Sequence, residues 1–93
     1  MSAMSAARVM QPSPRERVTE VVRRLLADRA IERPFTAEDD LRQVGLTSLD
    51  MVNLMLSVEA EFDLKIPDTD MTPRNFRTIA AIDALVTTLL RDR

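Results

Sequence analysis

The hydroxyl-bearing pair Thr47-Ser48 is the place in this sequence where chemistry could occur. An apolar-rich helix is predicted to begin at Ser48, and the free N–H groups and the dipole at a helix start favour a phosphate group. The 93 residues include no His and no Cys, so neither an imidazole base nor a thiolate is available to activate that hydroxyl. We therefore expect a chain that is not an enzyme, with no catalytic residue and no metal site, whose serine another enzyme could use.

The same segment also has a purely structural interpretation. Thr47 can cap the helix with its side chain while Asp50, at the third helical position, returns a hydrogen bond to the cap, which makes a capping box. Ser and Thr in front of an apolar run most often do nothing more than this. The choice between a modified serine and a simple cap depends on the rest of the chain.

Three amphipathic helices are predicted to position this segment. The first spans about 14–30, because residues 13–16 form a capping box with Pro14 at the first helical position and apolar residues then recur at helical spacing. The second spans about 48–62 and has an apolar arc wider than one neighbour requires. The last follows a Thr78 cap and runs to about residue 91.

The connections between these helices carry weaker signals. Residues 31–46 show no sustained period, so they are predicted to form a long loop with at most one helical turn. Gly45, the only glycine, lies near the end of that loop, where a positive φ is easiest for Gly. Thr72 and Pro73 pair a cap residue with Pro at the first helical position, which predicts a short helix over about 73–76.

The predicted fold class is therefore all-α: a small four-helix bundle of three main helices and one short helix, with a long loop between the first two main helices. Within the wide arc of the second helix, Val52 and Leu56 are expected in the core and Leu49 at the surface. The predicted core consists of Val18, Val22, Leu25, Leu26, Val44, Leu54, Met55, Val58, Phe62, Ile66, Phe76, Ile79, Ile82 and Leu85.

Charge is unevenly distributed along the chain, although the net charge is only −2. Residues 1–34 carry seven Arg against four acids, whereas residues 38–70 carry nine acids against one Arg and one Lys. An acidic centre repels nucleic acid and favours basic protein surfaces. No apolar run approaches the ~18 residues of a membrane span. We expect a disordered leader over 1–12, one domain over 13–93, and a cytoplasmic monomer that binds no nucleic acid.

The stretch from Gly45 onward resembles the region around the modified serine of acyl carrier proteins. In that family a Gly-x-Asp-Ser-Leu stretch opens the second helix, which ends in a Glu-x-x-Phe-like segment followed by Ile-Pro. The resemblance covers about residues 15–91. The matching segments are Gly45-Leu46-Thr47-Ser48-Leu49, Glu59-Ala60-Glu61-Phe62, Ile66-Pro67 and the helix opened by Thr78-Ile79.

The resemblance implies that Ser48 receives 4′-phosphopantetheine from coenzyme A through a phosphopantetheinyl transferase. It further implies that the thiol of this arm holds a carboxylic acid as a thioester, which a loading ligase attaches and downstream transferring enzymes receive. Thr47 departs from the family pattern, because the residue before the serine is usually Asp. The substitution keeps the helix cap but removes a charge that a transferase would meet beside the serine.

The start and outer side of the second helix are expected to contact these partners. Leu49 would be an apolar contact, and Asp50, Glu59 and Glu61 would steer enzymes that carry a basic patch. Met51, Met55 and Met71 are either gap-filling core residues or a pliable lining for a bound acyl chain. The predicted partner-binding residues are Thr47, Leu49, Asp50, Asn53, Glu59 and Glu61.

Several functions remain open at this point. A stand-alone specialised carrier is favoured, such as an aminoacyl carrier loaded by an amino acid:carrier protein ligase, because the modest net charge and Thr47 are unlike the strongly acidic carriers of fatty-acid synthesis. An acyl carrier for fatty-acid, polyketide or lipid biosynthesis is the first alternative. An unmodified helical adaptor module, in which Thr47 and Ser48 only cap a helix, is the alternative from another class.

Overall fold

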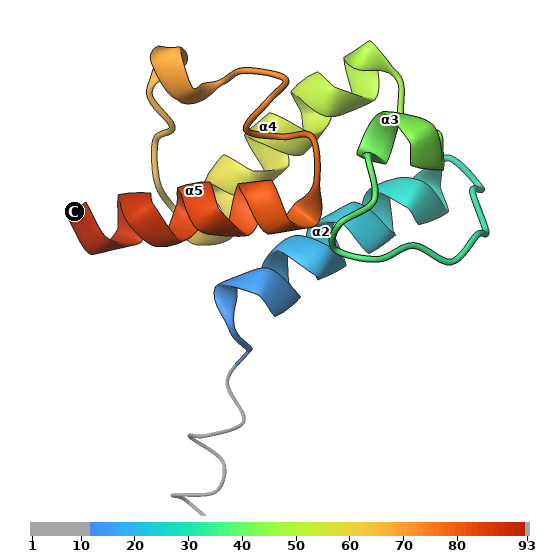
Figure 1. Cartoon of the computed structure of the whole chain (residues 1–93), viewed down its shortest axis with the longest axis horizontal. Helices are drawn as coiled ribbons and strands as arrows, with labels where there is room; N and C mark the ends of the chain where they lie inside the picture. Colours follow the sequence, from blue (N-terminus) through green and yellow to red (C-terminus); the bar gives the residue numbers. More distant parts are fainter. Residues whose placement is uncertain (1–11, 93) are drawn as a thin grey trace, which may run out of the picture.

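The computed structural model describes residues 12–92 and contains only helices, turns and loops in that range. The all-α prediction is confirmed. The predicted disorder of residues 1–12 falls, apart from Pro12, outside the described residues. The helices are α2 (Pro14–Asp28), α3 (Leu41–Val44), α4 (Ser48–Phe62) and α5 (Ile79–Asp92), with a 3-10 helix, η1 (Asp68–Asp70), between α4 and α5 (Figure 1).

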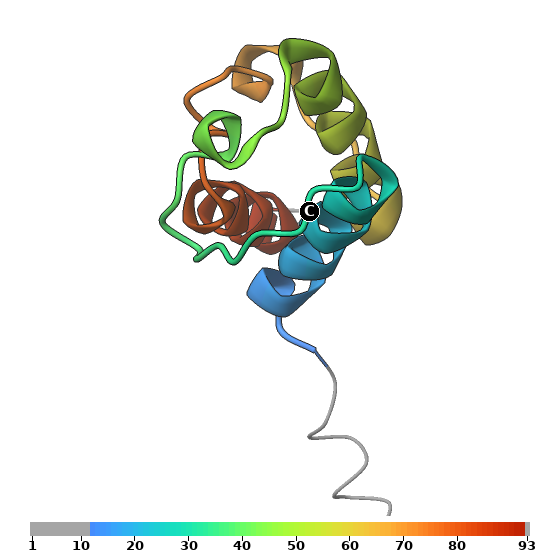
Figure 2. The same cartoon turned by 90° about the vertical axis from the view of Figure 1, so that its right-hand side faces the viewer.

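Helix α2 is the central element of the bundle, because it packs against both α4 and α5. Figure 1 shows it beneath these two helices, and Figure 2 shows the segment that contains η1 on the other side of α4. The backbone N–H of Leu41 donates to the carbonyl oxygen of Arg77 at 2.9 Å, which ties α3 to the residues that precede α5. The first turn of α4, α3 and the start of α5 therefore meet at one end of the molecule.

Local capping signals set the ends of the long helices. The Ser13 capping box is present at the start of α2, and the predicted bounds of α4 are those observed. Helix α2 ends two residues earlier than predicted, because Ala30 adopts a φ of 56° and turns the chain out of the helix. The hydroxyl of Thr78 accepts the backbone N–H of Ala81 at 3.0 Å, as expected for the cap of α5.

The connections differ from the prediction in one respect. The single helical turn in the first loop is α3, and Gly45 follows it with a φ of 132°, as expected. The predicted helix over 73–76 is wrong, because this segment forms only a turn. The side chain of Thr72 does cap it by accepting the N–H of Asn75 at 3.3 Å, but Phe76 is fully buried and the chain turns inward there before α5 begins.

Most of the predicted core is buried. Leu25, Met55 and Leu85 were expected in the core but are only half-buried at its edge, because each lies beside the stripe of its helix that faces the neighbours. The core also takes in apolar residues from segments without a period, such as Leu41 and Leu46, which no periodicity could identify. The buried residues missing from the predicted set are Val21, Leu41, Leu46, Met51 and Val86.

None of the helices in residues 12–92 combines the length and the apolar character that crossing a bilayer requires.

Candidate functional site

Ser48 is the first residue of α4, and its side chain is exposed. The capping of the helix is carried out by its neighbours: the Thr47 hydroxyl accepts the N–H of Asp50 at 3.2 Å, and the Asp50 carboxylate accepts the N–H of Thr47 at 2.9 Å. Within residues 12–92, the Ser48 hydroxyl makes no hydrogen bond that would occupy it. Of the Thr-Ser pair, only Thr47 therefore caps the helix, and the exposed Ser48 hydroxyl is available for modification.

Asp50 does not lie where the partner-binding prediction placed it. Its side chain is only 3% exposed, and its carboxylate lies 3.6 Å from the guanidinium of Arg29, at the end of α2. The expectation that Asp50 meets partner proteins at the surface is wrong, because the capping box turns this carboxylate back toward the backbone. Asp50 instead fixes the first turn of α4, and with it the position of Ser48.

The pKa of Asp50 lies below its ordinary value of 3.8, mainly because the backbone N–H of Thr47 donates to the carboxylate. The hydrogen bond with the Thr47 side chain and the positive charge of Arg29 lower it further, against the opposing effect of burial. A carboxyl group whose pKa is lowered by folding stabilises the folded state at pH values above its unfolded pKa. That stabilisation disappears as the pH falls through the folded-state pKa.

We therefore expect Asp50→Asn to lower the free energy of unfolding at pH 7. The difference from the wild type should shrink as the pH is lowered below about 4, because protonation removes from the wild-type carboxyl the charge that the amide lacks. Urea unfolding at a series of pH values between 3 and 7 measures both proteins. A difference of constant size over that range would contradict the assigned role.

The outer face of α4 presents an apolar strip, formed by Leu49, Val52 and Leu56. Their exposed fractions are 70%, 49% and 55%. The prediction of an exposed Leu49 is confirmed, whereas the prediction that Val52 and Leu56 are core residues is wrong. The opposite side of α4, with Leu54 and Val58, fills the core, and the neighbouring helices do not extend around to the strip. An exposed apolar strip of this kind is typical of a protein interaction site.

The other predicted partner-binding residues of α4 divide into two groups. Asn53 is exposed next to the strip. Glu59 and Glu61 are half-buried and have partners within the chain: Glu59 accepts the backbone N–H of Ile66 at 2.8 Å, and Glu61 accepts the Nε–H of Arg17 at 2.9 Å. Glu61 also lies 3.6 Å from Arg24. Its charge is therefore compensated inside the molecule rather than presented to a partner.

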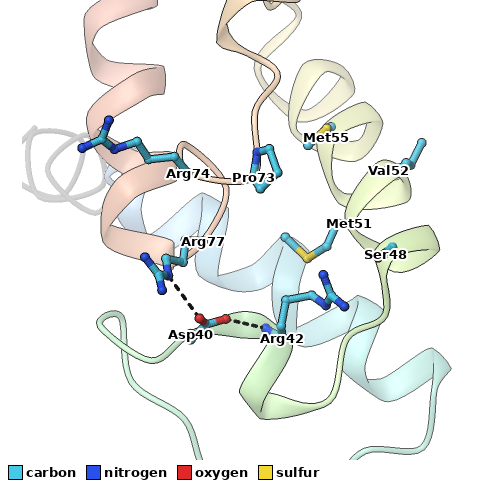
Figure 3. A pocket seen from close by; sticks show the side chains of 9 residues that line it. All are labelled: Asp40, Arg42, Ser48, Met51, Val52, Met55, Pro73, Arg74 and Arg77. Atoms are coloured by element: carbon cyan, nitrogen blue, oxygen red, sulfur yellow. Dashed lines mark hydrogen bonds and ion pairs between the residues drawn. The ribbon is translucent and has the colours of Figure 1, made fainter.

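A groove of about 510 Å³ opens beside Ser48, between α3, α4 and the residues that precede α5 (Figure 3). Met51 and Met55 lie on its α4 side, so both interpretations of these methionines apply in part, since Met51 is also buried against the core. The basic side of the groove was not predicted, because its arginines, Arg42, Arg74 and Arg77, come from two segments that lie more than 30 positions apart in the sequence. The groove is lined by Asp40, Arg42, Ser48, Met51, Val52, Met55, Pro73, Arg74 and Arg77.

One acid and one arginine of the rim form an ion pair. The Nε–H of Arg77 donates to the Asp40 carboxylate at 3.1 Å, and the backbone N–H of Arg42 donates to the other oxygen at 2.9 Å. The hydrogen bond from Arg77 is the main reason why the pKa of Asp40 lies below its ordinary value, and the Arg42 N–H adds to it. Asp40 is therefore ionised and paired at neutral pH.

Comparisons with known proteins give matches over most of the chain. The family model for a phosphopantetheine attachment site matches residues 16–86. Two curated relatives from Bradyrhizobium diazoefficiens are aminoacyl carrier protein 1, 44% identical over 77 residues (83% of this chain and 86% of the relative), and aminoacyl carrier protein 2, 46% identical over 70 residues (75% and 79%).

A solved structure is similar as well. It is the crystal structure of the Bradyrhizobium japonicum glycine:carrier protein ligase in complex with its cognate carrier protein and an analogue of glycyl adenylate. The matching chain is 41% identical to this one, with a TM-score of 0.74, and the match covers 81% of this chain and 96% of that chain.

Proposed function

The chain belongs to the phosphopantetheine-attachment family of carrier proteins, and we propose that it is an aminoacyl carrier whose arm is attached at Ser48. Its covalent cofactor is 4′-phosphopantetheine, which a phosphopantetheinyl transferase takes from coenzyme A. When bound, the arm supplies a thiol that can hold a carboxylic acid as a thioester. The assignment to Ser48 rests on the hydrogen bonds in the first turn of α4. Thr47 and Asp50 cap the helix, and the Ser48 hydroxyl makes no hydrogen bond within residues 12–92.

The surroundings of Ser48 fit a phosphodiester. The start of a 15-residue helix carries the positive end of its dipole, and Arg42 and Arg74 line the groove that opens from the serine. Thr47 takes the place of the family's usual Asp without disturbing the cap. The residues present therefore suit the attachment of a negatively charged group at this hydroxyl.

We propose an amino acid as the cargo, loaded by a ligase that activates it with ATP. This proposal is supported by the relatives, which are named aminoacyl carrier proteins, and by the similarity to a chain in complex with a glycine:carrier protein ligase. A fatty, polyketide or lipid acyl group is the alternative cargo, which the apolar part of the groove around Met51 and Met55 would suit.

The proposal includes the division of roles between the chain and its partners. Attachment and loading are catalysed by the transferase and the ligase. This chain contributes the hydroxyl and the docking surface, without catalysis of its own. The proposed partner contacts are Thr47, Leu49 and Asn53, and we add Val52 and Leu56 because both side chains are exposed on the same helix. We place this activity in the cytoplasm, where coenzyme A and ATP are available, and in one monomeric domain over residues 13–93.

Intact-protein mass spectrometry tests the proposal in two stages. Incubation with coenzyme A and a broad-specificity phosphopantetheinyl transferase should add one phosphopantetheine per chain. Incubation of the product with ATP, a mixture of amino acids and the Bradyrhizobium japonicum ligase should then add one aminoacyl group, which hydroxylamine should release because it is a thioester. Failure of the first stage with every transferase tried, and an unmodified mass in protein from the native host, would favour the unmodified adaptor.

A further inference from the structure

The outer face of α4, where a partner must approach Ser48, carries no charge. Every exposed residue of this helix is uncharged, and its three acids are buried or half-buried. Asp50 caps the helix, Glu59 binds the backbone of Ile66, and Glu61 is paired with Arg17. The acids of α4 are therefore not presented on the exposed face of this helix. The exposed residues of α4 are Ser48, Leu49, Val52, Asn53, Leu56, Ser57 and Ala60.

The charges that are exposed beside this face are positive. Arg42, Arg74 and Arg77 are exposed and line the groove next to Ser48. In Figure 3 the Arg42 side chain points toward the first turn of α4, whereas the Arg74 side chain lies on the opposite side of the groove and points away from α4. Asp40 is the single acid in the lining, and it is paired with Arg77. The guanidinium groups of Arg42 and Arg74 form no ion pair with any acid in the range 12–92. The groove therefore has a net positive charge, opposite in sign to the whole chain.

We infer that the ligase that loads this carrier docks on it with an apolar patch flanked by carboxylates, which meet the Leu49-Val52-Leu56 strip and the Arg42 and Arg74 guanidinium groups. The inference rests on the proposed function. It reverses the expectation from the sequence, in which an acidic carrier attracts basic partners. It goes beyond the position of the attachment site, because it assigns the sign of the charge that the partner must carry.

The range of electrostatic forces explains how a chain of net charge −2 can attract an acidic surface. At physiological ionic strength the Debye length is about 8 Å, so a docking carboxylate senses the nearby arginines much more strongly than acids on the far faces of the molecule. Local charges of this kind accelerate association and orient the partner. The arginines should therefore affect the rate of encounter more than the rate of the chemical step.

The experiment compares the loading of phosphopantetheinylated variants by the Bradyrhizobium japonicum ligase. Steady-state kinetics is measured at ionic strengths of about 0.01 M and about 1 M, where the Debye length is about 30 Å and about 3 Å. The test variant is R42E/R74E, with R42Q/R74Q as its neutral counterpart. The control is R23E/R91E, which changes the net charge equally on α2 and at the end of α5, where both arginines are exposed. Circular dichroism verifies that each variant is folded.

We expect wild-type kcat/KM to fall as the ionic strength rises. At low ionic strength R42E/R74E should reduce kcat/KM about 10-fold or more, chiefly through KM, with R42Q/R74Q between it and the wild type. The difference should shrink at high ionic strength, and R23E/R91E should behave like the wild type. Wild-type loading that becomes faster with added salt, or equal rates for wild type and R42E/R74E, would overturn the inference.

A second readout separates docking from any effect of the arginines on the arm. Ser48→Ala carries no arm but keeps the proposed docking surface, so it should inhibit the loading of the wild-type carrier competitively. Adding R42E and R74E to Ser48→Ala should weaken that inhibition. Inhibition of equal strength would show that the arginines act only on the phosphodiester of the arm and have no part in docking, which overturns the inference. If the ligase never loads the phosphopantetheinylated wild type, the proposal of an aminoacyl carrier fails, and the inference fails with it.

Discussion

Ser48→Ala is expected to abolish attachment of phosphopantetheine, and with it every later step of loading and transfer. The phosphodiester requires an oxygen atom at this position, and alanine has none. The fold should be retained, because Thr47 and Asp50 supply both hydrogen bonds of the capping box and alanine is well accepted within a helix. We expect the free energy of unfolding to change by less than about 0.5 kcal/mol, and the protein mass to stay unchanged after incubation with coenzyme A and transferase.

Ser57→Ala is the matched control for this experiment. Ser57 is also exposed on α4, but it lies in the middle of the helix, where no free N–H groups are available to a phosphate. The Ser57 variant should gain one phosphopantetheine at the wild-type rate. A Ser48→Ala protein that still gains the group would place the attachment site at another hydroxyl and would remove the basis of the proposed function.

The first turn of α4 could be predicted from the sequence because its determinants are local. A cap residue, an acid three positions later and a following apolar run lie within a few residues of one another, and capping depends on these neighbours alone. The predicted bounds of α4 were correct for this reason. The choice of Ser48 as the modified serine rests on the same segment together with the family resemblance, and it stays a prediction. The free hydroxyl of Ser48 could be recognised only from the structure, which shows that Thr47 and Asp50 satisfy each other.

The burial of individual residues on α4 could not be predicted in the same way. Val52 and Leu54 are both apolar, yet one is 49% exposed and the other is fully buried. A helical period divides a helix into faces, but the number of neighbours decides how many of these faces are covered. The burial of Asp50 could not be predicted from the helical period, because Arg29, at the end of another helix, lies 3.6 Å from its carboxylate.

The basic groove depends on contacts that are distant in sequence. Arg42 is on α3, whereas Arg74 and Arg77 precede α5, and they meet because α3 is hydrogen-bonded to Arg77. The net negative charge of residues 38–70 predicted a negative surface at the site, whereas the groove is positive. The sum of the charges along a segment cannot distinguish carboxylates that form caps and ion pairs from those that are presented to a partner. Here several carboxylates form hydrogen bonds or ion pairs within the chain.

Leu49→Asp is expected to reduce loading by the ligase strongly while leaving the fold intact. The side chain is 70% exposed beside Ser48, and the exposure of so large an apolar group next to the proposed attachment site favours a central contact for a docking enzyme. Truncation of a contact that is a binding hot spot costs about 2 kcal/mol or more, roughly a 30-fold loss, and a carboxylate in an apolar patch adds a desolvation cost. We therefore expect kcat/KM to fall about 30-fold or more.

Two variants on the same helix establish that this loss comes from docking rather than from the fold. Leu49→Ala should retain the wild-type free energy of unfolding within about 0.5 kcal/mol and show a smaller but clear loss of kcat/KM. Leu54→Ala removes a fully buried side chain of the core and should lower the free energy of unfolding by about 2–5 kcal/mol. If Leu49→Asp were loaded at the wild-type rate, or lost loading only in proportion to lost folded protein, the strip would have no role in docking. The combination of lost loading and unchanged urea unfolding would instead locate the ligase contact on the exposed face of α4.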